Sequence, residues 1–540
     1  MATPLASLRR LARNVGWLAR QGFASGWLRG RFWLRVRLRA PLLEGRAPLL
    51  FPGRDATLAL VDLLATLEAA AGDPAVRGVL VDLGNAPEGL AQGMALRRAL
   101  ASLRERGKPV IAYGEVLGAE ALLVGSGASR LYMPPSGSLF LVGLRLEGFF
   151  LGELLERLGV RADVVRVGDY KTAAETFLRR DMSPEQREQL GHLLEDRYEA
   201  LVTAVAEGRS LDPEVLRGLV DEGPYPATEA AQLGLVDDCL YPDELEERLE
   251  AESPGSAPGE GRPVRCVDAP VYHALRVADP GWLPLFQETP RVAYVVASGP
   301  IRRGAGRRGV ASEPFGALLE SLRRDRRVVG VVLRVDSPGG DGLASDLLHR
   351  RLERLRAEKP VVVSMGEVAA SGGYYLSAAG DAVLAEGPTV TGSIGVVGGK
   401  LDLSGLYERL GVGRDGVERG ARAGFLSEGR PFTPAERSAL RHQMEALYEA
   451  FLDRVARGRR LSQGAVRALA GGRVWSGARA LEHGLVDRLG GPIEALAEVR
   501  RRAGLSADQR IHLDVHPRTP RFPSLPQLLG LLLRGRGGGP

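Results

Sequence analysis

The sequence of 540 residues predicts an α/β protein in which one fold is used twice. Apolar, β-branched runs that are typical of buried strands alternate with stretches whose leucines recur at helical spacing. The second half of the chain also repeats the first at an offset of 250 to 252 residues. With 44% hydrophobic residues, a chain of this length can form two or more domains with cores of their own.

The repeat is visible in strands, helices and turns. The run VRGVLV reappears as VVGVVL, and the helix that follows each run has an apolar stripe of leucines three or four residues apart. The matched segments are 76–81 and 328–333, 96–103 and 348–355, 108–110 and 359–361, 114–116 and 366–368, and 234–237 and 484–487. We therefore expect an N-terminal repeat at 31–250 and a C-terminal repeat at 289–505.

Two segments join or follow the repeats. Residues 251–288 are expected to be a linker and connecting segment, because 252–261 is rich in Pro, Gly, Ser and Glu. Residues 506–540 are expected to be a C-terminal tail. Its apolar stretch, 525–533, contains a proline and is too short to span a membrane.

The N-terminal arm, residues 1–30, begins the most basic part of the chain. Residues 1–54 contain eleven arginines and one acidic residue, which gives a net charge of +10, whereas the remainder sums to about −4. Leucines and tryptophans interspersed with arginines predict a basic amphipathic helix that suits an anionic membrane surface. An arm packed on its own domain or without order is the alternative. No nucleic-acid partner is expected, because no nucleic-acid-binding fold accompanies the charge.

The stretch 361–379 (VVVSMGEVAASGGYYLSAA) holds a candidate nucleophile. Three valines predict a buried strand, and Ser371 follows in a turn of small residues, before a helix expected to begin near Tyr374. A serine at that place faces unpaired backbone N–H groups and the positive end of the helix dipole, which suits chemistry that forms an oxyanion. A plain strand-to-helix turn is the alternative.

A glycine turn and a lysine supply two further candidates. In residues 336–340 (DSPGG) the two glycines let backbone N–H groups point outward, as an oxyanion site requires. Lysine is scarce, with four residues against 68 arginines, and arginine does not deprotonate to act as a base. Lys171, in GDYK at 168–171, is the candidate base, and a solvated surface lysine is the alternative.

The two halves differ at these positions in a complementary way. Ser371 aligns with Ala119, and the glycine pair 339–340 aligns with Pro-Glu, so the first half has neither the nucleophile nor the donors. Lys171 aligns with about Ala421 in the second half. We therefore predict a composite site, with lysine from the first repeat and serine from the second.

The other side chains that could supply the chemistry do not fit. None of the seven histidines lies in a catalytic context, so a Ser-His-Asp triad is not expected.

A lysine base must be neutral near pH 7, and burial lowers a lysine pKa by ~3 to 5 units, so Lys171 should lie in an apolar interface between the repeats. Ser393, in TGSIG, is a candidate acceptor for the amine, or else a turn serine. Cys239 and Cys266 lack metal-ligand spacing, and no metal or cofactor is expected.

The motifs GDYKTAAETF, DSPGG, EVAASGGYYLSAAGD, TGSIGV and VWSGARALEHGLVDRLGG resemble the signal peptide peptidase A (protease IV) family in its long two-domain form. They occur in the family's order, and the resemblance covers about residues 31–505. It implies a tandem duplication of a ClpP/crotonase-like domain, a serine endopeptidase with a Ser-Lys dyad, and a homo-oligomer like a tetrameric ring. The long form usually has a transmembrane anchor, and this chain has only the basic arm. We therefore expect peripheral contact with the bacterial cell membrane, with the cytoplasm as the alternative.

Carried onto this sequence, the resemblance implies a role for each candidate residue. Ser371 matches the nucleophile, Lys171 the general base, Gly340 and Gly372 the oxyanion donors, and Ser393 the hydroxyl that orients the lysine. The substrates implied are cleaved signal peptides and other short, extended, apolar peptides. Two other functions stay open, namely an acyl-CoA hydratase or isomerase, which needs no serine nucleophile, and a non-catalytic membrane-associated scaffold.

Overall fold

The computed structural model describes most of both repeats. The described residues are 11–12, 14–15, 28, 30–45, 58–84, 86, 89–251, 264–278, 289–306, 308–506 and 509–517. Most of the arm with its expected amphipathic helix, the Pro- and Gly-rich segment 252–261 and most of the tail lie outside these residues. Among the helices that are described, none combines the length and the apolar character needed to cross a membrane.

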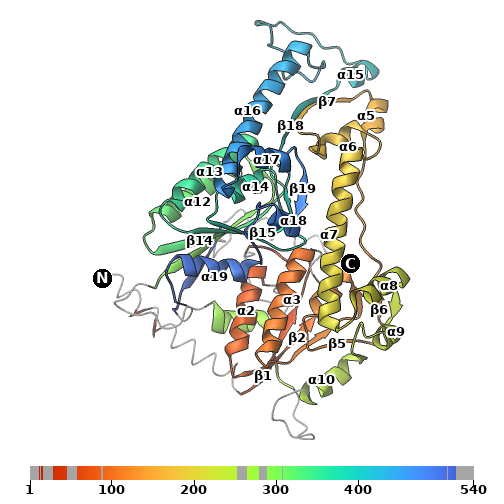
Figure 1. The fold of residues 1–540 in the computed structure, drawn as a ribbon, viewed down its shortest axis with the longest axis vertical. Helices are drawn as coiled ribbons and strands as arrows, with labels where there is room; N and C mark the ends of the chain where they lie inside the picture. Colours follow the sequence, from red (N-terminus) through yellow and green to blue (C-terminus); the bar gives the residue numbers. More distant parts are fainter. Residues whose placement is uncertain are drawn as a thin grey trace, which may run out of the picture.

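The first half of the chain is built on a six-stranded sheet in which all neighbours are parallel (Figure 1). Its order is β10 (Cys266–Asp268), β1 (Phe32–Arg37), β2 (Val76–Asp82), β3 (Val110–Tyr113), β5 (Arg130–Met133) and β9 (Asp238–Cys239). Helix α2 (Leu60–Gly72) precedes β2, and helix α3 (Leu90–Glu105) follows it. The predicted stripe of Leu96, Leu100 and Leu103 on α3 is buried in the core of this half.

The second half has a sheet of the same kind. Its main path is β19 (Val474–Ser476), β17 (Val390–Gly392), β15 (Val361–Ala370), β14 (Val328–Ser337), β11 (Arg291–Ser298) and β21 (His512–His516). Strand β16 (Ala382–Ala385) pairs with β15, and β20 (Arg488–Leu489) pairs with β16. Helix α12 (Ser312–Arg324) precedes β14, helix α13 (Gly342–Arg356) follows it, and Leu348, Leu352 and Leu355 of α13 are buried.

The two halves also share their irregular features. The beginning of strand β15 pairs with β16 and its end pairs with β17, and β17 pairs antiparallel with β19. In the first half two separate strands, β3 and β4 (Val116–Gly118), make the equivalent pairings. Strand β3 pairs with β5, and β4 pairs with β6 (Ser138–Phe140), which is antiparallel to β8 (Tyr225–Pro226). The duplication predicted from the sequence therefore extends to the order and direction of the strands.

Each half extends further than the boundaries expected from the sequence. Strand β10 belongs to the first sheet although it falls within 251–288, and β21 belongs to the second sheet although it falls within 506–540. Both strands pair in parallel with the first strand of their half, β1 or β11. The connecting segment and the tail thus each complete the edge of a sheet.

A buried ion pair fixes the halves to one another. Arg334 of β14, whose side chain is fully buried, donates to both carboxylate oxygens of Glu44 at 2.8 and 2.9 Å. Its remaining donors reach the hydroxyl of Ser364 and the carbonyl of Met365. Because a buried guanidinium is costly to leave unpaired, Glu44 of the first half is held against the sheet of the second.

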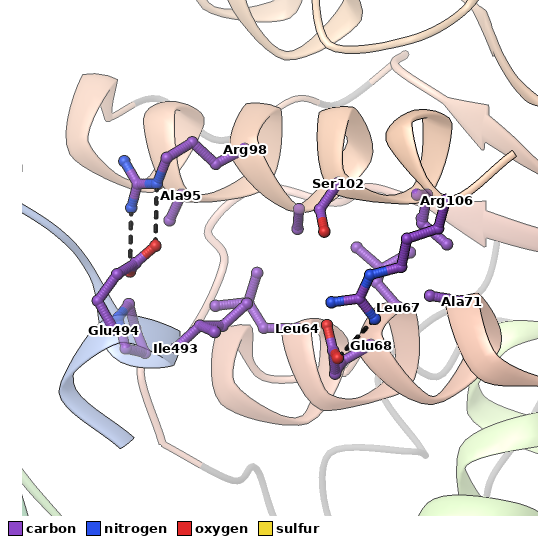
Figure 2. A pocket seen from close by; sticks show the side chains of 13 residues that line it. Leu64, Leu67, Glu68, Ala71, Ala95, Arg98, Ser102, Arg106, Ile493 and Glu494 are labelled. Atoms are coloured by element: carbon purple, nitrogen blue, oxygen red, sulfur yellow. Dashed lines mark hydrogen bonds and ion pairs between the residues drawn. The ribbon is translucent and has the colours of Figure 1, made fainter. Parts of the chain in front are cut away.

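A second joint lies where α2 and α3 meet α19 (Pro492–Arg502) of the second half. Figure 2 shows a pocket there, with the Arg98 and Glu494 ion pair at one end and the Arg106 and Glu68 pair at the other. Arg98 also forms two hydrogen bonds to Glu386, which is buried. The pocket is lined by apolar side chains and these ion pairs, so it belongs to the packing between the halves.

One strand of each half also pairs with a strand of the other half, and this pairing positions the site. Strand β7 (Arg161–Val167) of the first half runs antiparallel to β18 (Val396–Asp402) of the second, with Val167 opposite Val396. The two strands lie together in the upper part of Figure 1. Lys171 follows β7 by four residues and Ser393 precedes β18 by three, so this ladder brings both segments to one place.

Candidate active site

Ser371 lies in a strained turn between β15 and α14 (Gly372–Ser377). Its backbone has φ 54° and ψ −118°, and it is the N-cap of α14, which begins two residues earlier than the sequence suggested. Its N–H donates to the carbonyl of Gly392 at 2.8 Å, and its carbonyl accepts from Tyr375. A non-glycine residue rarely adopts a positive φ, and such strain is commonly found at functional sites.

Lys171 reaches Ser371 within a single chain. Its Nζ lies 3.1 Å from the Ser371 hydroxyl oxygen, 2.9 Å from the Ser393 hydroxyl oxygen and 2.9 Å from the Ser393 carbonyl oxygen. Only 5% of the lysine is exposed. The structure therefore brings together the three side chains proposed from the sequence, and it places the amine at the interface between the halves.

The surroundings of the amine favour its uncharged form. Burial lowers the pKa of Lys171 from 10.5 to about 8. Among the described residues, the hydrogen-bond partners of the amine are two oxygens of Ser393 and the hydroxyl of Ser371, and none is a carboxylate. A neutral amine has two N–H donors and one lone pair. If both donors serve Ser393, the lone pair is left to accept the Ser371 proton.

Ser393 is itself held in an unusual backbone conformation. Its φ is 52°, and among the described residues only Ser210, Ser371, Ser393 and Arg460 are non-glycine residues with positive φ. Its N–H donates to the carbonyl of Arg473 at 2.7 Å. Two of the four strained residues thus meet at the lysine amine, and the strain lets Ser393 present both its hydroxyl and its carbonyl to one nitrogen.

Two backbone N–H groups beside Ser371 are open. Among the described residues, neither the Gly340 nor the Gly372 N–H has a hydrogen-bond partner. Gly339 packs tightly against Ser371 and Gly372, because a Cβ on it would lie 2.6 Å from the Gly372 nitrogen and 2.8 Å from the Ser371 Cβ. Gly340 is held by a bridge to Ile301, whose N–H donates to Gly339 and whose carbonyl accepts from Asp341. The turn therefore offers two donors next to the hydroxyl.

Several residues that place the lysine were not foreseen. The Tyr170 N–H donates to the carbonyl of Gly471 at 2.9 Å, and a Cβ on Gly472 would overlap the backbone of Lys171. Gln189 donates to the carbonyl of Tyr170 and to the hydroxyl of Thr172. The adjacent glycines of LAGGRVW were the signal in the sequence, but a glycine pair alone does not tell which segment approaches it.

The corresponding place in the first half lacks the side chains that meet at the Lys171 amine. Glycines of positive φ, Gly168 and Gly420, and the shared segment ERLGV, at 156–160 and 408–412, fix the offset at 252 there. This corrects the counterpart of Lys171 from about Ala421 to Ala423. Ala119 stands where Ser371 does, and Leu141, which is buried, stands where Ser393 does. The counterparts of the glycine pair, 87–88, lie outside the described residues.

A serine hydroxyl beside a buried amine and open N–H donors, on a mixed α/β fold, is the arrangement expected of a serine hydrolase. Comparison with known proteins agrees, because residues 102–254 and 353–506 match the model of peptidase family S49. The chain belongs to this family and is a serine-type endopeptidase.

Relatives that match most of this chain are also proteases. The chain is 32% identical over 499 residues to a chloroplastic serine protease SPPA of Arabidopsis thaliana, which covers 89% of this chain and 72% of the relative. It is 31% identical over 449 residues to protease 4 of Haemophilus influenzae, covering 81% and 71%. A protease 4 of Salmonella typhi is 31% identical over 472 residues, covering 85% and 74%.

Proposed function

We propose that this protein hydrolyses short, extended, apolar peptides, cleaved signal peptides among them, with Ser371 as nucleophile and Lys171 as general base. The observation that carries the proposal is the contact of 3.1 Å between the Lys171 amine and the Ser371 hydroxyl, beside two amine contacts to Ser393. The resemblance to signal peptide peptidase A supports the substrate class and a ClpP/crotonase-like fold for each half.

In the first step, the neutral Lys171 amine takes the Ser371 proton while the serine oxygen attacks the peptide carbonyl carbon. The carbonyl oxygen becomes an oxyanion that accepts from the Gly340 and Gly372 N–H groups. The ammonium then gives its proton to the leaving amine as the peptide C–N bond breaks. Water, deprotonated by the same amine, attacks the acyl ester and releases the second product and the serine.

The position of the dyad limits the substrate. Lys171 is 5% exposed and Ser371 is half-buried, so a peptide bond must enter as an extended segment without its own fold. The basic arm, residues 1–30, would hold the enzyme at an anionic membrane surface, where apolar peptides released from the membrane gather.

A serine-reactive phosphonate tests activation and position at once. The wild-type protein should be labelled at Ser371, identified by mass spectrometry of the digested protein, and should cleave a synthetic signal peptide. Lys171→Met should lose both, because the hydroxyl is no longer deprotonated.

Lys359→Met is the matched control, since Lys359 donates only to the carbonyls of Leu322 and Asp325 and should leave labelling unchanged. Labelling of another serine, or wild-type labelling of the Lys171→Met protein, would show the dyad to be wrong. Vesicle binding with no peptide turnover by the wild type would instead support a scaffold.

A further inference from the structure

Three side chains that take no part in the proposed reaction form a cluster beside Lys171. The Arg473 guanidinium carbon lies 3.8 Å from the centre of the Tyr170 ring, and the guanidinium donates to Glu188 Oε1 at 2.6 Å. The Tyr170 hydroxyl donates to Glu188 Oε2 at 2.8 Å. We call Tyr170, Glu188 and Arg473 the Arg473 cluster. Because a guanidinium is attracted to an aromatic face and to a carboxylate, each of the three side chains holds the other two in place.

The Arg473 cluster joins the two halves of the chain. Tyr170 is the residue before the lysine, Glu188 lies on α7 (Pro184–Arg209), and Arg473 immediately precedes β19 of the second half. In Figure 1, α7 runs alongside β19, against which it packs. Only 19% of the Arg473 side chain is exposed, so its contacts with the first half are largely shielded from water.

The backbone of Arg473 reaches the other segment that contacts the amine. Its carbonyl accepts the Ser393 N–H at 2.7 Å, and Ser393 supplies two of the three hydrogen-bond contacts of the Lys171 amine. One residue earlier, Gly472 packs directly on the backbone of Lys171. Arg473 therefore contacts both segments that must meet, through its side chain on the lysine side and through its carbonyl on the Ser393 side.

None of the three cluster side chains is kept at the corresponding place of the other half. The helix that carries the glutamate is kept, because α7 and its counterpart α16 (Pro434–Arg459) both have 26 residues. The Arg473 cluster thus occurs only at the junction that holds the serine and the lysine, and the shared fold does not require it. The counterparts of Tyr170, Glu188 and Arg473 are Arg422, Ser438 and Gly223.

We propose that Arg473 is a positioning residue for the Ser-Lys dyad, which ties the segment of Lys171 to the segment of Ser393 and so brings the amine to the Ser371 hydroxyl. This inference rests on the proposed function. Arg473 is not among the hydrogen-bond partners of the amine, so it acts through Tyr170 and Ser393. Because misplacing a reacting group by about 1 Å can cost about 100-fold in rate, such an effect falls on kcat.

Replacing the guanidinium tests this role. Arg473→Met should lower kcat for a synthetic signal peptide by about 100-fold and change KM by less than about twofold, because the substrate contacts remain. The pH midpoint of kcat/KM should also rise from about 8 toward 10.5, since an amine that is held less tightly is less buried. A merely structural role would lower activity by the same factor at every pH and leave the midpoint unchanged.

Tyr170→Leu is the second variant, and it changes no charge near neutral pH. It removes the ring on which Arg473 lies and should raise the midpoint in the same direction. The double variant should show little more than the larger of the two single shifts, because both changes break the same contact. Melting temperatures show whether each variant is folded, and if Arg473→Met does not fold, Tyr170→Leu decides.

The matched control is Arg248→Met. Arg248, on α10 (Pro242–Ala251) low in Figure 1, also lies over a tyrosine ring and near a carboxylate, with 5.7 Å to the ring centre of Tyr132 and 3.8 Å to Asp238. It has no contact with the dyad segments, so its kcat and its midpoint should be those of the wild type.

The outcomes separate this inference from the proposed function. A wild-type midpoint near 8 that is unchanged in both variants, shifts that add in the double variant, or an equal shift in the control would overturn the role of Arg473 and leave the proposed function in place. A wild type with no midpoint near 8, or with no phosphonate label on Ser371, would overturn both.

Discussion

The two halves of the molecule keep the same scaffold and differ in their chemistry. Lys108 of the first half donates to the carbonyls of Asp73 and Val76, and Lys359 of the second donates in the same way to Leu322 and Asp325. These lysines close the same turn in both repeats. By contrast, Lys171 has an alanine as its counterpart. The difference separates lysines that hold the fold from the one that we propose serves the reaction.

This separation explains why the site must lie between the halves. The first half keeps Lys171 but has Ala119 in place of the serine, and the second keeps Ser371 and Ser393 but has Ala423 in place of that lysine. The ladder of β7 with β18, together with the contacts of Tyr170 and Lys171 with Gly471 and Gly472, brings the two sets within hydrogen-bond distance. The proposed site is therefore single, and its parts come from both copies of the fold.

The largest expected effect comes from giving Lys171 the side chain of its counterpart in the second half. Lys171→Ala copies Ala423 into the first half and should lower kcat/KM for a synthetic signal peptide by at least about 10⁴-fold, because a serine without its base is a poor nucleophile. Steady-state kinetics measure this loss. Circular dichroism should show an unchanged fold, since only neutral hydrogen bonds are lost.

The reciprocal graft should fail, which sharpens the comparison. Ala119→Ser with Ala423→Lys, added to the Lys171→Ala protein, should restore no turnover, because the first half also lacks the glycine turn and has Leu141 where Ser393 stands. Recovery of even a hundredth of wild-type activity would mean that the serine and lysine alone make the site.

A smaller effect is expected from the oxyanion turn. Gly340 has φ 150°, and a Cβ on it would overlap the carbonyl oxygen of Ile301, so Gly340→Ala must displace the N–H that faces the substrate. Loss of one such donor lowers kcat by ~100 to 1000-fold. Gly342→Ala is the matched control, because a Cβ there meets no atom within 4 Å and its activity should be that of the wild type. Equal activity of the two variants would exclude Gly340 as a donor.

Much of the fold was predictable because the core residues repeat. The leucine stripes of α3 and α13 and the valine runs of β14 and β15 follow from periodicity alone. Strands β10 and β21 were missed, because each is short and follows a segment of linker-like composition or lies in the tail. A strand at the edge of a sheet has little apolar pattern of its own, and its partner decides that it forms.

The side chains of the candidate site could be proposed from the sequence, but the residues that hold them in place could not. Ser371 and Lys171 could be proposed because the halves differ at those positions, and Ser393 could be proposed from the motif TGSIG. Nothing in the sequence indicates that Gly472 packs on Lys171 or that Ile301 holds Gly340, since both contacts join segments far apart in the chain. The alignment near Lys171 was also two residues off, and the shared segment ERLGV together with the positive φ of Gly168 and Gly420 corrected it.

The smallest expected effect is the pH dependence that Lys171 gives to activity and stability, which sets it apart from the paired lysines Lys108 and Lys359. Burial lowers the pKa of Lys171 to about 8, and the base must be neutral, so kcat/KM should rise about tenfold per pH unit below 8 and level off above it. Stability follows the same group. Between pH 8 and about 10.4 the unfolded chain binds the proton that the folded chain does not, so the wild type gains about 3 kcal/mol relative to Lys171→Met as pH rises. Urea unfolding of both proteins at pH 7 and pH 10 measures that difference. An equal change in the two proteins would mean that Lys171 is charged in the folded state, and a lysine that stays charged cannot be the base.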